Sequence, residues 1–335
     1  MHMQERTKDE LLLDLRDVET HFFAEGSITR ALGGVSFEVR KGETLGVVGE
    51  SGCGKSVTAL SILRLLPKNN ARTVGGQILF GGRDLLRLSD REMRKVRGGR
   101  IGMIFQDPMT SLSPVHTIGR QIAEAVQIHT SASRSDSIQR AIEMLRLVRI
   151  ADPERRIMNY PHEMSGGMRQ RVMIAMALAC SPELLIADEP TTALDVTIQA
   201  QILRLIVDLK ERTGTSVVFI THDLGVVAET CQRVIVMYAG KIVEQASVTE
   251  LFARPAHPYT QGLMRSVLDR RQGRRARLPE IPGTVPNLRD PIAGCSFAPR
   301  CPHARQLCRE SAPTLRGLAR DHAAACWRAE EVMDA

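Results

Sequence analysis

The hydrophobic pattern of this 335-residue chain contains two short, mostly apolar runs that lead directly into polar residues. Residues 44–48, TLGVV, predict a buried strand, and residues 57–66, VTALSILRLL, have helical spacing and predict a helix that stops at Pro67. Residues 184–187 are all apolar and are followed by Asp188 and Glu189, as expected for a central parallel strand whose carboxyl end opens on a site. Functional residues are therefore expected at the carboxyl ends of these two predicted strands.

The loop after the first strand matches the pattern G-x-x-x-x-G-K-[ST] of phosphate-binding loops. Its glycines allow backbone N–H groups to surround phosphates, and the following helix points its N-terminus at them. Lys55 is expected to neutralise the outer phosphates, and Ser56 to offer a hydroxyl to Mg²⁺. The predicted nucleotide contacts are Gly49, Glu50, Ser51, Gly52, Cys53, Gly54, Lys55, Ser56 and Val57.

The two carboxylates after the second strand suit phosphoryl transfer to water. Asp188 is expected to hold the Mg²⁺ hydration shell, and Glu189 to polarise the attacking water. Between the two motifs, Ser165 and Gly166 begin a segment with helical spacing, a second glycine-rich helix N-terminus that can bind an anion. We expect this second N-terminus to serve the nucleotide of another subunit.

Composition describes an ordinary globular protein, with 43% hydrophobic and 25% charged residues. No apolar run approaches the ~18 residues of a membrane span, and the start of the chain lacks the order of a secretory signal, so a cytosolic protein is expected. The net charge is +7, and several of the arginines lie between residues 265 and 277. We interpret this segment as a solvated linker. With 12 aromatic residues and no aromatic-basic interleaving, nucleic acid is not an expected partner.

The stretch MSGGMRQR before LLIADEPTTALD resembles the signature motif of ATP-binding cassette (ABC) ATPases. Other family elements follow in order: Gln106 resembles the Q-loop, residues 192–195, TALD, the D-loop with Asp195, and His222 the switch histidine. Phe22 lies where the family places an aromatic ring against adenine, with Phe23 as the alternative. The resemblance covers about residues 10–255 and implies an α/β fold: a P-loop NTPase, RecA-like core with an antiparallel β subdomain and a helical subdomain at about 107–180.

The resemblance also implies a mechanism. Two cassettes would stack head to tail, with each ATP between the phosphate loop of one and the signature residues of the other, namely Ser165, Gly166, Gly167 and Met168. Mg²⁺ would be held by Ser56, Gln106 and Asp188, while Glu189, His222 and Gln106 would act in catalysis. Met168 stands where the family usually has Gln, and this replacement removes a polar group near the γ-phosphate of the partner's ATP.

ABC ATPases also act on DNA and on ribosomes. The 60 or so residues between Gln106 and Ser165 have no sustained heptads, unlike repair members, and the chain has one phosphate loop, unlike ribosomal members. Exporters commonly fuse a membrane domain, which is absent here. The expected protein is an importer ATPase, peripheral at the cytoplasmic face of the inner membrane. Its expected partners are a second ATPase subunit, which is usually a different chain with another copy of this one as the alternative, two permease subunits and, indirectly, an extracytoplasmic solute-binding protein.

The tail from His257 onward resembles the C-terminal region of oligopeptide and dipeptide permease ATPase subunits. This implies import of di- or oligopeptides, with nickel, glutathione or opine-type solutes as alternatives. The expected domains are the cassette, 1–255, and a small cysteine-containing extension, 256–335.

Four of the seven cysteines lie in the last 41 residues: Cys295, Cys301, Cys308 and Cys326. Disulfides are disfavoured in the cytosol. The cysteines are separated by five, six and 17 residues, which does not match the spacing of structural zinc sites. Spacing alone therefore leaves three alternatives: an iron-sulfur cluster, an unusual zinc site, or cysteines that only pack in a core. His303 and His322 are candidate substitute zinc ligands. The subfamily resemblance favours a four-iron four-sulfur cluster on the four cysteines, with a structural or regulatory role.

The other three cysteines, Cys53, Cys180 and Cys231, are interpreted as small buried hydrophobic residues. A reactive thiol at Cys53 is the alternative, because the helix N-terminus can lower its pKa.

Overall fold

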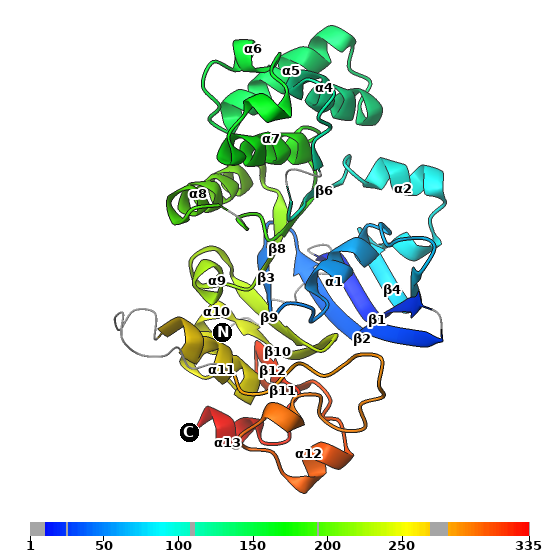
Figure 1. The fold of residues 1–335 in the computed structure, drawn as a ribbon, viewed down its shortest axis with the longest axis vertical. Helices are drawn as coiled ribbons and strands as arrows, with labels where there is room; N and C mark the ends of the chain where they lie inside the picture. Colours follow the sequence, from blue (N-terminus) through cyan, green and yellow to red (C-terminus); the bar gives the residue numbers. More distant parts are fainter. Residues whose placement is uncertain (1–10, 25, 108–110, 193, 269–280, 335) are drawn as a thin grey trace, which may run out of the picture. The chain divides into compact units, whose positions relative to one another are not determined.

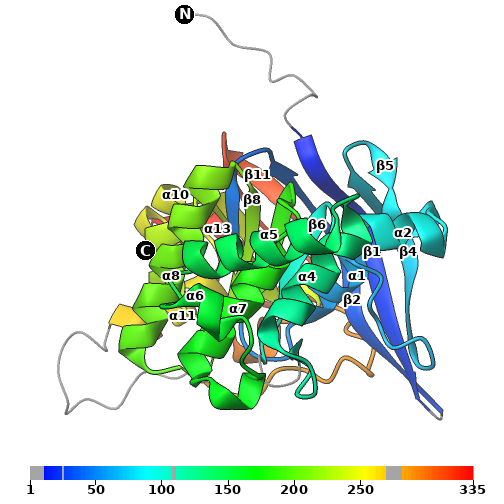
Figure 2. The same cartoon turned by 90° about the horizontal axis from the view of Figure 1, so that it is seen from above.

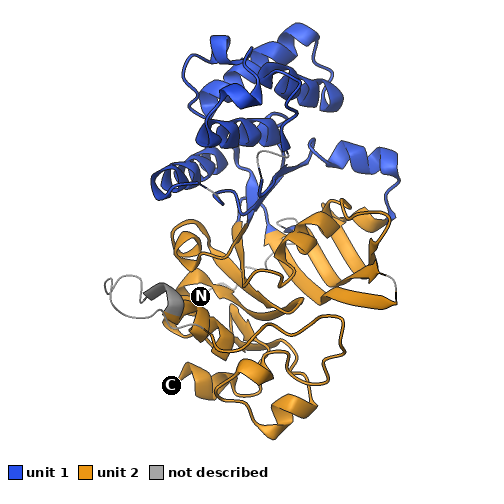
Figure 3. Cartoon of the chain, in the orientation of Figure 1, with its two compact units in different colours: residues 1–12, 40–43, 87–219 blue, residues 13–39, 44–86, 220–335 orange. Residues whose placement is uncertain are grey.

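The computed structural model describes residues 11–24, 26–107, 111–192, 194–268 and 281–334. The chain divides into two compact units (Figure 3). Unit 1 comprises residues 1–12, 40–43 and 87–219, and unit 2 comprises residues 13–39, 44–86 and 220–335. Ala193 of the predicted D-loop and most of the arginine-rich segment lie outside the described residues.

Unit 2 contains an antiparallel sheet in the strand order β2-β1-β4-β5 (Figure 1). Its strands are β1 (Leu11–Ala24), β2 (Ser27–Arg40), β4 (Ala71–Phe80) and β5 (Arg83–Asp84). The pairs β1–β4 and β4–β5 are both antiparallel. Leu13 and Leu15 of β1 are buried, as is Phe80 of β4, so one side of the sheet packs on a core. The antiparallel β subdomain expected from the sequence is confirmed.

The other strands of unit 2 follow the order β11-β12-β10-β9-β3. β3 (Thr44–Val48) is parallel to β9 (Arg233–Tyr238), whereas β10 (Lys241–Ser247) is antiparallel to β9. From the C-terminal extension, β12 (His322–Ala324) pairs with β10 and β11 (Arg316–Ala319) pairs with β12. The extension thus continues the sheet that contains β3, β9 and β10 by backbone hydrogen bonds.

The helices of unit 2 are short. They are α1 (Lys55–Ile62), α9 (Leu224–Thr230), α10 (Val248–Ala253), α11 (Pro258–Leu268), α12 (Gln306–Glu310) and α13 (Ala329–Met333), with a 3-10 turn, η5, at Ala298–Arg300. Ala256, Ala324 and Ala329 form a small apolar cluster in the extension, against which Leu318 and Met333 pack. The core is small because the elements that contribute to it, such as β12 and α13, are only a few residues long.

Unit 1 contains the parallel strands β6 (Ile101–Ile104) and β7 (Leu184–Asp188), followed by β8 (Ser216–Thr221) in the order β8-β7-β6. Its helices are α2 (Asp90–Val96), α4 (Ile118–His129), α5 (Arg134–Leu147), α6 (Pro153–Arg156), α7 (Gly166–Leu178) and α8 (Val196–Thr213), with 3-10 turns η2 (Leu85–Arg87) at the unit boundary and η3 (Pro161–Glu163). Figures 1 and 2 show α4, α5 and α7 side by side in this unit. Within the described ranges, no helix has the length and apolarity of a membrane span.

The helix after the phosphate loop ends earlier than the sequence pattern predicts. It stops at Ile62 and not near Pro67, because Arg64 adopts a left-handed conformation with φ 50°. Arg64 N–H donates to the Ser61 carbonyl (3.1 Å) and Leu65 N–H to the Leu60 carbonyl (2.8 Å), the two bonds of a Schellman motif. Apolar spacing alone did not show that a non-glycine residue takes this position.

Candidate functional site

The phosphate loop of unit 2 joins β3 to α1, as predicted, and two of its glycines are required by close packing. A Cβ on Gly49 would lie 2.3 Å from the Met237 carbonyl oxygen, and one on Gly54 would lie 2.9 Å from a Leu32 methyl. Both residues also have positive φ, at 155° and 107°. The backbone can therefore bend tightly here and open its N–H groups to a phosphate. Ser51 and Gly52 at the tip of the loop are exposed.

Lys55 begins α1 and lies almost completely buried, with 5% of its surface exposed. Its ammonium donates to the carbonyl oxygens of Gly49 (2.8 Å) and Glu50 (3.1 Å). The side chain is thus folded back over the loop, at the place where its charge can meet a bound anion. Ser56 and Val57, the next residues of the helix, are partly exposed.

Cys53 is buried, and desolvation raises the pKa of its thiol against the opposing effect of the Lys55 charge. The burial of Cys53 favours the interpretation as a small buried hydrophobic residue over that of a reactive thiol at this helix N-terminus. Cys231 is buried as well, whereas Cys180 is partly exposed and its thiol donates to the Ala125 carbonyl at 3.5 Å.

Glu50 has partners in the C-terminal extension that sequence reasoning missed. Its carboxylate accepts two hydrogen bonds from the Arg300 guanidinium, at 2.6 and 3.0 Å, and its backbone N–H donates to the Tyr259 hydroxyl at 2.8 Å. These bonds raise the pKa of Arg300 above its ordinary value, with the Glu50 hydrogen bonds as the main cause. No local sequence signal connects residues 250 positions apart.

The predicted adenine contact, Phe22, lies in β1 opposite Ala71 and is partly exposed. The alternative ring, Phe23, has the Arg72 guanidinium above it at 4.5 Å from the centroid. His222 directly follows β8 and is exposed at the carboxyl end of that strand.

In unit 1, the end of β7 presents the two predicted carboxylates. Asp188 is buried, and Glu189 is half-buried with φ 45°, an uncommon conformation for a residue with a side chain. One carboxylate oxygen of Glu189 accepts hydrogen bonds from the Gln106 side-chain amide (3.1 Å) and the Thr192 hydroxyl (3.0 Å). The structure thus brings Gln106 and Glu189 together as a catalytic pair would require, and adds Thr192, which sequence reasoning had not selected.

The signature residues open α7, as predicted. The exposed Ser165 is the N-cap, and its hydroxyl accepts from the Met168 N–H at 3.3 Å. A Cβ on Gly167 would lie 3.0 Å from Ile198 of α8, so a glycine allows the two helices to approach. Further along α7, the buried Gln170 donates to the Pro190 carbonyl at 2.6 Å, a contact from α7 to the loop after Glu189 that sequence reasoning missed. Gly166 and Met168 are partly exposed in the first turn of α7.

Asp195, the predicted D-loop residue, is the N-cap of α8, where its carboxylate accepts from the Ile198 N–H at 3.0 Å. Its side chain is exposed.

Comparison with known proteins identifies the family to which the chain belongs. Residues 32–192 match the family model described as ABC transporter, and residues 243–308 match the model described as Oligopeptide/dipeptide transporter, C-terminal region. A probable peptide ABC transporter ATP-binding protein of Sinorhizobium fredii is 75% identical over 334 residues, covering 100% of both chains. The chain belongs to the ABC transporter ATP-binding proteins.

Other relatives and solved structures agree. The dipeptide transport ATP-binding protein DppD of Bacillus subtilis is 50% identical over 95% of each chain, and the oligopeptide transport ATP-binding protein OppD of that species is 51% identical over 94% of this chain and 88% of its own. A dimeric ATP-binding cassette, MJ0796, in a post-hydrolysis state with ADP and Pi, matches 71% of this chain and 99% of its own at 29% identity and a TM-score of 0.64. The ABC cassette fold is thereby confirmed, and membership implies ATP and Mg²⁺.

The four clustered cysteines of this ABC protein line one small cavity of about 20 Å³ in unit 2. His303, Phe297 and Trp327 line it as well. Burial raises the pKa of the thiols of Cys295, Cys301 and Cys326, that of Cys326 to about 11, and neighbouring thiols add to each shift. In the described part of the chain, however, no group of three or more His, Cys, Asp or Glu side chains is arranged as a metal site.

His322, a candidate substitute zinc ligand, has another partner. Its Nε2 atom lies 2.7 Å from the Glu244 carboxylate, and both side chains are fully buried. Glu244 also accepts from the backbone N–H groups of Ala256 (2.7 Å) and His257 (2.9 Å). This network fixes β12 on β10, and His322 is not among the residues that line the four-cysteine cavity, whereas His303 is.

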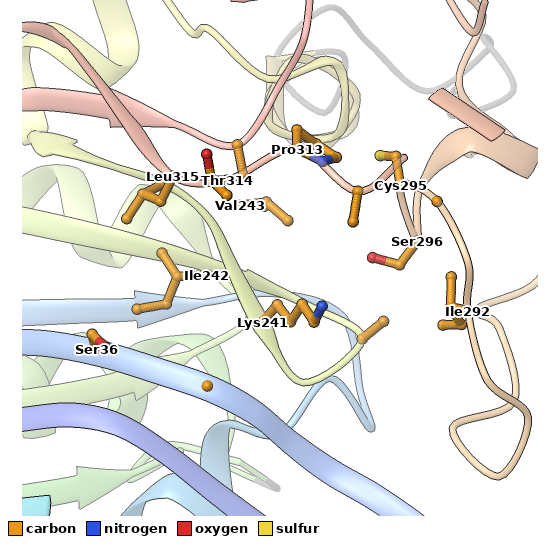
Figure 4. A pocket seen from close by; sticks show the side chains of 15 residues that line it. Ser36, Lys241, Ile242, Val243, Ile292, Cys295, Ser296, Pro313, Thr314 and Leu315 are labelled. Carbon is orange, nitrogen blue, oxygen red and sulfur yellow. The ribbon is translucent and has the colours of Figure 1, made fainter. Parts of the chain in front are cut away.

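A larger cavity of about 460 Å³ lies in unit 2 beside β10 and the extension (Figure 4). Lys241 and Ile242 line it on one side, and Cys295, Ser296 and Thr314 line it on the other. Cys295 also lines the four-cysteine cavity. The larger cavity contains none of the predicted nucleotide contacts, so it is separate from the candidate ATP site.

Proposed function

We propose that this protein is the ATP-hydrolysing subunit of an importer for di- or oligopeptides. The observation that carries the proposal is the match over residues 243–308 to the oligopeptide/dipeptide transporter C-terminal region, joined to full-length relatives named for peptide transport. In this proposal residues 1–255 form the cassette, with a helical subdomain at about 107–180, and residues 256–335 form the extension specific to the subfamily.

The chemistry is divided among the predicted residues. Lys55 and the N–H groups of the phosphate loop bind the phosphates, and Ser56, Gln106 and Asp188 hold Mg²⁺. Glu189, oriented by Gln106 and Thr192, positions and activates the attacking water, while His222 senses the γ-phosphate. Phe22 stacks on the adenine.

The partners follow from the cassette family. Ser165, Gly166, Gly167 and Met168, at the N-terminus of α7, serve the ATP bound by a second cassette. The favoured partner is a different ATPase subunit. Two permease subunits hold the pair at the cytoplasmic face of the inner membrane, and a solute-binding protein on the other side delivers the peptide.

The substitution Glu189→Gln tests the catalytic assignment. It keeps the size of the side chain and removes the base, so ATP binding should persist while turnover falls about 100-fold or more. Glu183→Gln is the matched control, because Glu183 is exposed, pairs with Arg100 and lies just before β7. Near-normal ATP hydrolysis by Glu189→Gln would contradict the assignment.

We propose further that Cys295, Cys301, Cys308 and Cys326 hold a four-iron four-sulfur cluster, with zinc as the alternative. The convergence of four thiols on one cavity supports the proposal, since buried thiolates would need a bound cation to offset their mutual repulsion. When bound, the cluster would supply cross-links that stabilise the extension, whose own apolar core is small.

Anaerobic purification tests this second proposal. The protein should be brown, with iron and labile sulfide of about four each per chain. Cys326→Ser should lose most of the iron, whereas Cys180→Ser, at a cysteine of unit 1, should keep it. Colourless protein with one zinc ion per chain would establish the alternative.

A further inference from the structure

The contact between the extension and the phosphate loop is built around one buried arginine. Arg300, at the end of η5, has 5% of its side chain exposed. Its guanidinium makes the two bonds to the Glu50 carboxylate and also donates to the carbonyl oxygens of Pro282 (3.0 Å) and Ile281 (3.0 Å). These carboxylate and carbonyl acceptors hold the planar guanidinium in one orientation, so the ion pair between Arg300 and Glu50 has a fixed geometry.

The surroundings hold this arrangement in place. Tyr238 of β9, Tyr259 of α11 and Phe297 form an aromatic cluster with ring centroids 4.7 to 5.4 Å apart. All three rings are buried, and the Arg300 guanidinium lies 5.8 Å from the Tyr238 centroid. The cluster therefore fixes both the arginine and the hydroxyl that binds the Glu50 N–H.

Glu50 is consequently anchored at three points. Arg300 holds its carboxylate, Tyr259 holds its N–H, and Lys55 holds its carbonyl oxygen. Two of these anchors come from outside the phosphate loop and belong to the residues that follow the cassette. A carboxylate in a loop that binds a polyphosphate would repel its ligand unless a cation were paired with it.

We propose that Arg300 is a positioning residue for ATP: it fixes the conformation of the phosphate loop through Glu50 and neutralises that carboxylate. The inference rests on the proposed ATPase function and adds to it a residue outside the cassette motifs. Arg300 lies between Cys295 and Cys301, in a turn closed by hydrogen bonds from Ala298 N–H to the Cys295 carbonyl (3.0 Å) and from Cys301 N–H to the Ala298 carbonyl (3.3 Å). One turn thus joins the cysteine-lined cavity to the phosphate loop.

The test measures ATP affinity, KM and kcat for Arg300→Met in the full-length protein. We expect Kd and KM for ATP to rise about tenfold, with kcat within about threefold, because Arg300 contacts Glu50 and none of the residues assigned to hydrolysis. Arg316→Met is the matched control, since Arg316 belongs to the same extension but is exposed and pairs with Glu330. The control should keep the affinity of the original protein.

A double variant distinguishes positioning from general damage to the fold. Adding Glu50→Gln to Arg300→Met removes the unpaired negative charge but does not restore the lost anchor, so the affinity should recover only in part, from about tenfold to about threefold below the original. Arg300→Lys keeps the charge without the two-pronged geometry and should raise KM about threefold to fivefold, which provides the measurement if Arg300→Met does not fold.

Three outcomes separate the hypotheses. If Arg300→Met and Arg300→Lys bind ATP as well as the original, or if Glu50→Gln rescues nothing, the inference is wrong although the ATPase assignment stands. If the original protein neither binds nor hydrolyses ATP, the proposed function itself fails.

Discussion

Tyr259→Phe deletes a single oxygen atom and tests whether α11 stabilises the phosphate loop. The hydroxyl accepts the Glu50 N–H at 2.8 Å, and Tyr259 is fully buried with its ring against Tyr238 and Phe297. Phenylalanine keeps the ring packing and removes only this acceptor. A net hydrogen bond contributes about 0.5 to 1.5 kcal/mol, and a donor left without a partner in a buried place costs about 1 to 3 kcal/mol. Because the Tyr259 side chain is inaccessible to water, we expect a loss of about 2 kcal/mol in the free energy of unfolding.

The assay is urea unfolding followed by the fluorescence of Trp327, the single tryptophan, which lies in the same unit as Tyr259. Tyr160→Phe is the matched control: the same atom is removed from a tyrosine that is 39% exposed, and the change should stay within about 0.5 kcal/mol. Equal stabilities for Tyr259→Phe and Tyr160→Phe would refute the reasoning that the hydroxyl anchors the loop.

Three further substitutions test other contacts. Asp195→Ala removes the N-cap of α8 and should lower stability by about 1 kcal/mol in thermal unfolding, whereas Asp195→Asn, which keeps an acceptor, should not. Glu244→Gln weakens the buried network with His322 and should cost about 2 to 3 kcal/mol in urea unfolding; an unchanged midpoint would contradict the role given to this network. Gln106→Ala releases one partner of Glu189 and removes a proposed Mg²⁺ contact, so it should lower kcat about tenfold and also weaken Mg-ATP binding; an unchanged kcat would remove Gln106 from the catalytic group.

Local patterns were sufficient for the parts of the site that depend on neighbouring residues. The strand, glycine-rich loop and helix around Lys55 appear as β3 and α1, and the apolar run before Asp188 appears as β7. Ser165 caps α7, where the glycine-rich motif predicted a helix start. In each case the residue types and the spacing that determine the structure lie within about ten positions of each other.

Contacts between segments that are distant in the sequence could not be predicted from local patterns. Arg300 pairs with Glu50, and His322 pairs with Glu244, because β12 adds to β10 and places the extension beside the phosphate loop. The partner of a histidine or an arginine cannot be predicted from the residue type, because both residue types occur on surfaces, in ligand sites and in buried networks. Only the strand register decided that His322 meets a carboxylate and not the cysteines.

The central claim, that the protein powers a peptide importer, is tested most directly by purifying the tagged full-length protein from its native membrane and identifying what accompanies it. The account predicts two permease subunits and a second ABC ATPase subunit in stoichiometric amounts. Recovery of DNA or ribosomes in their place would contradict it.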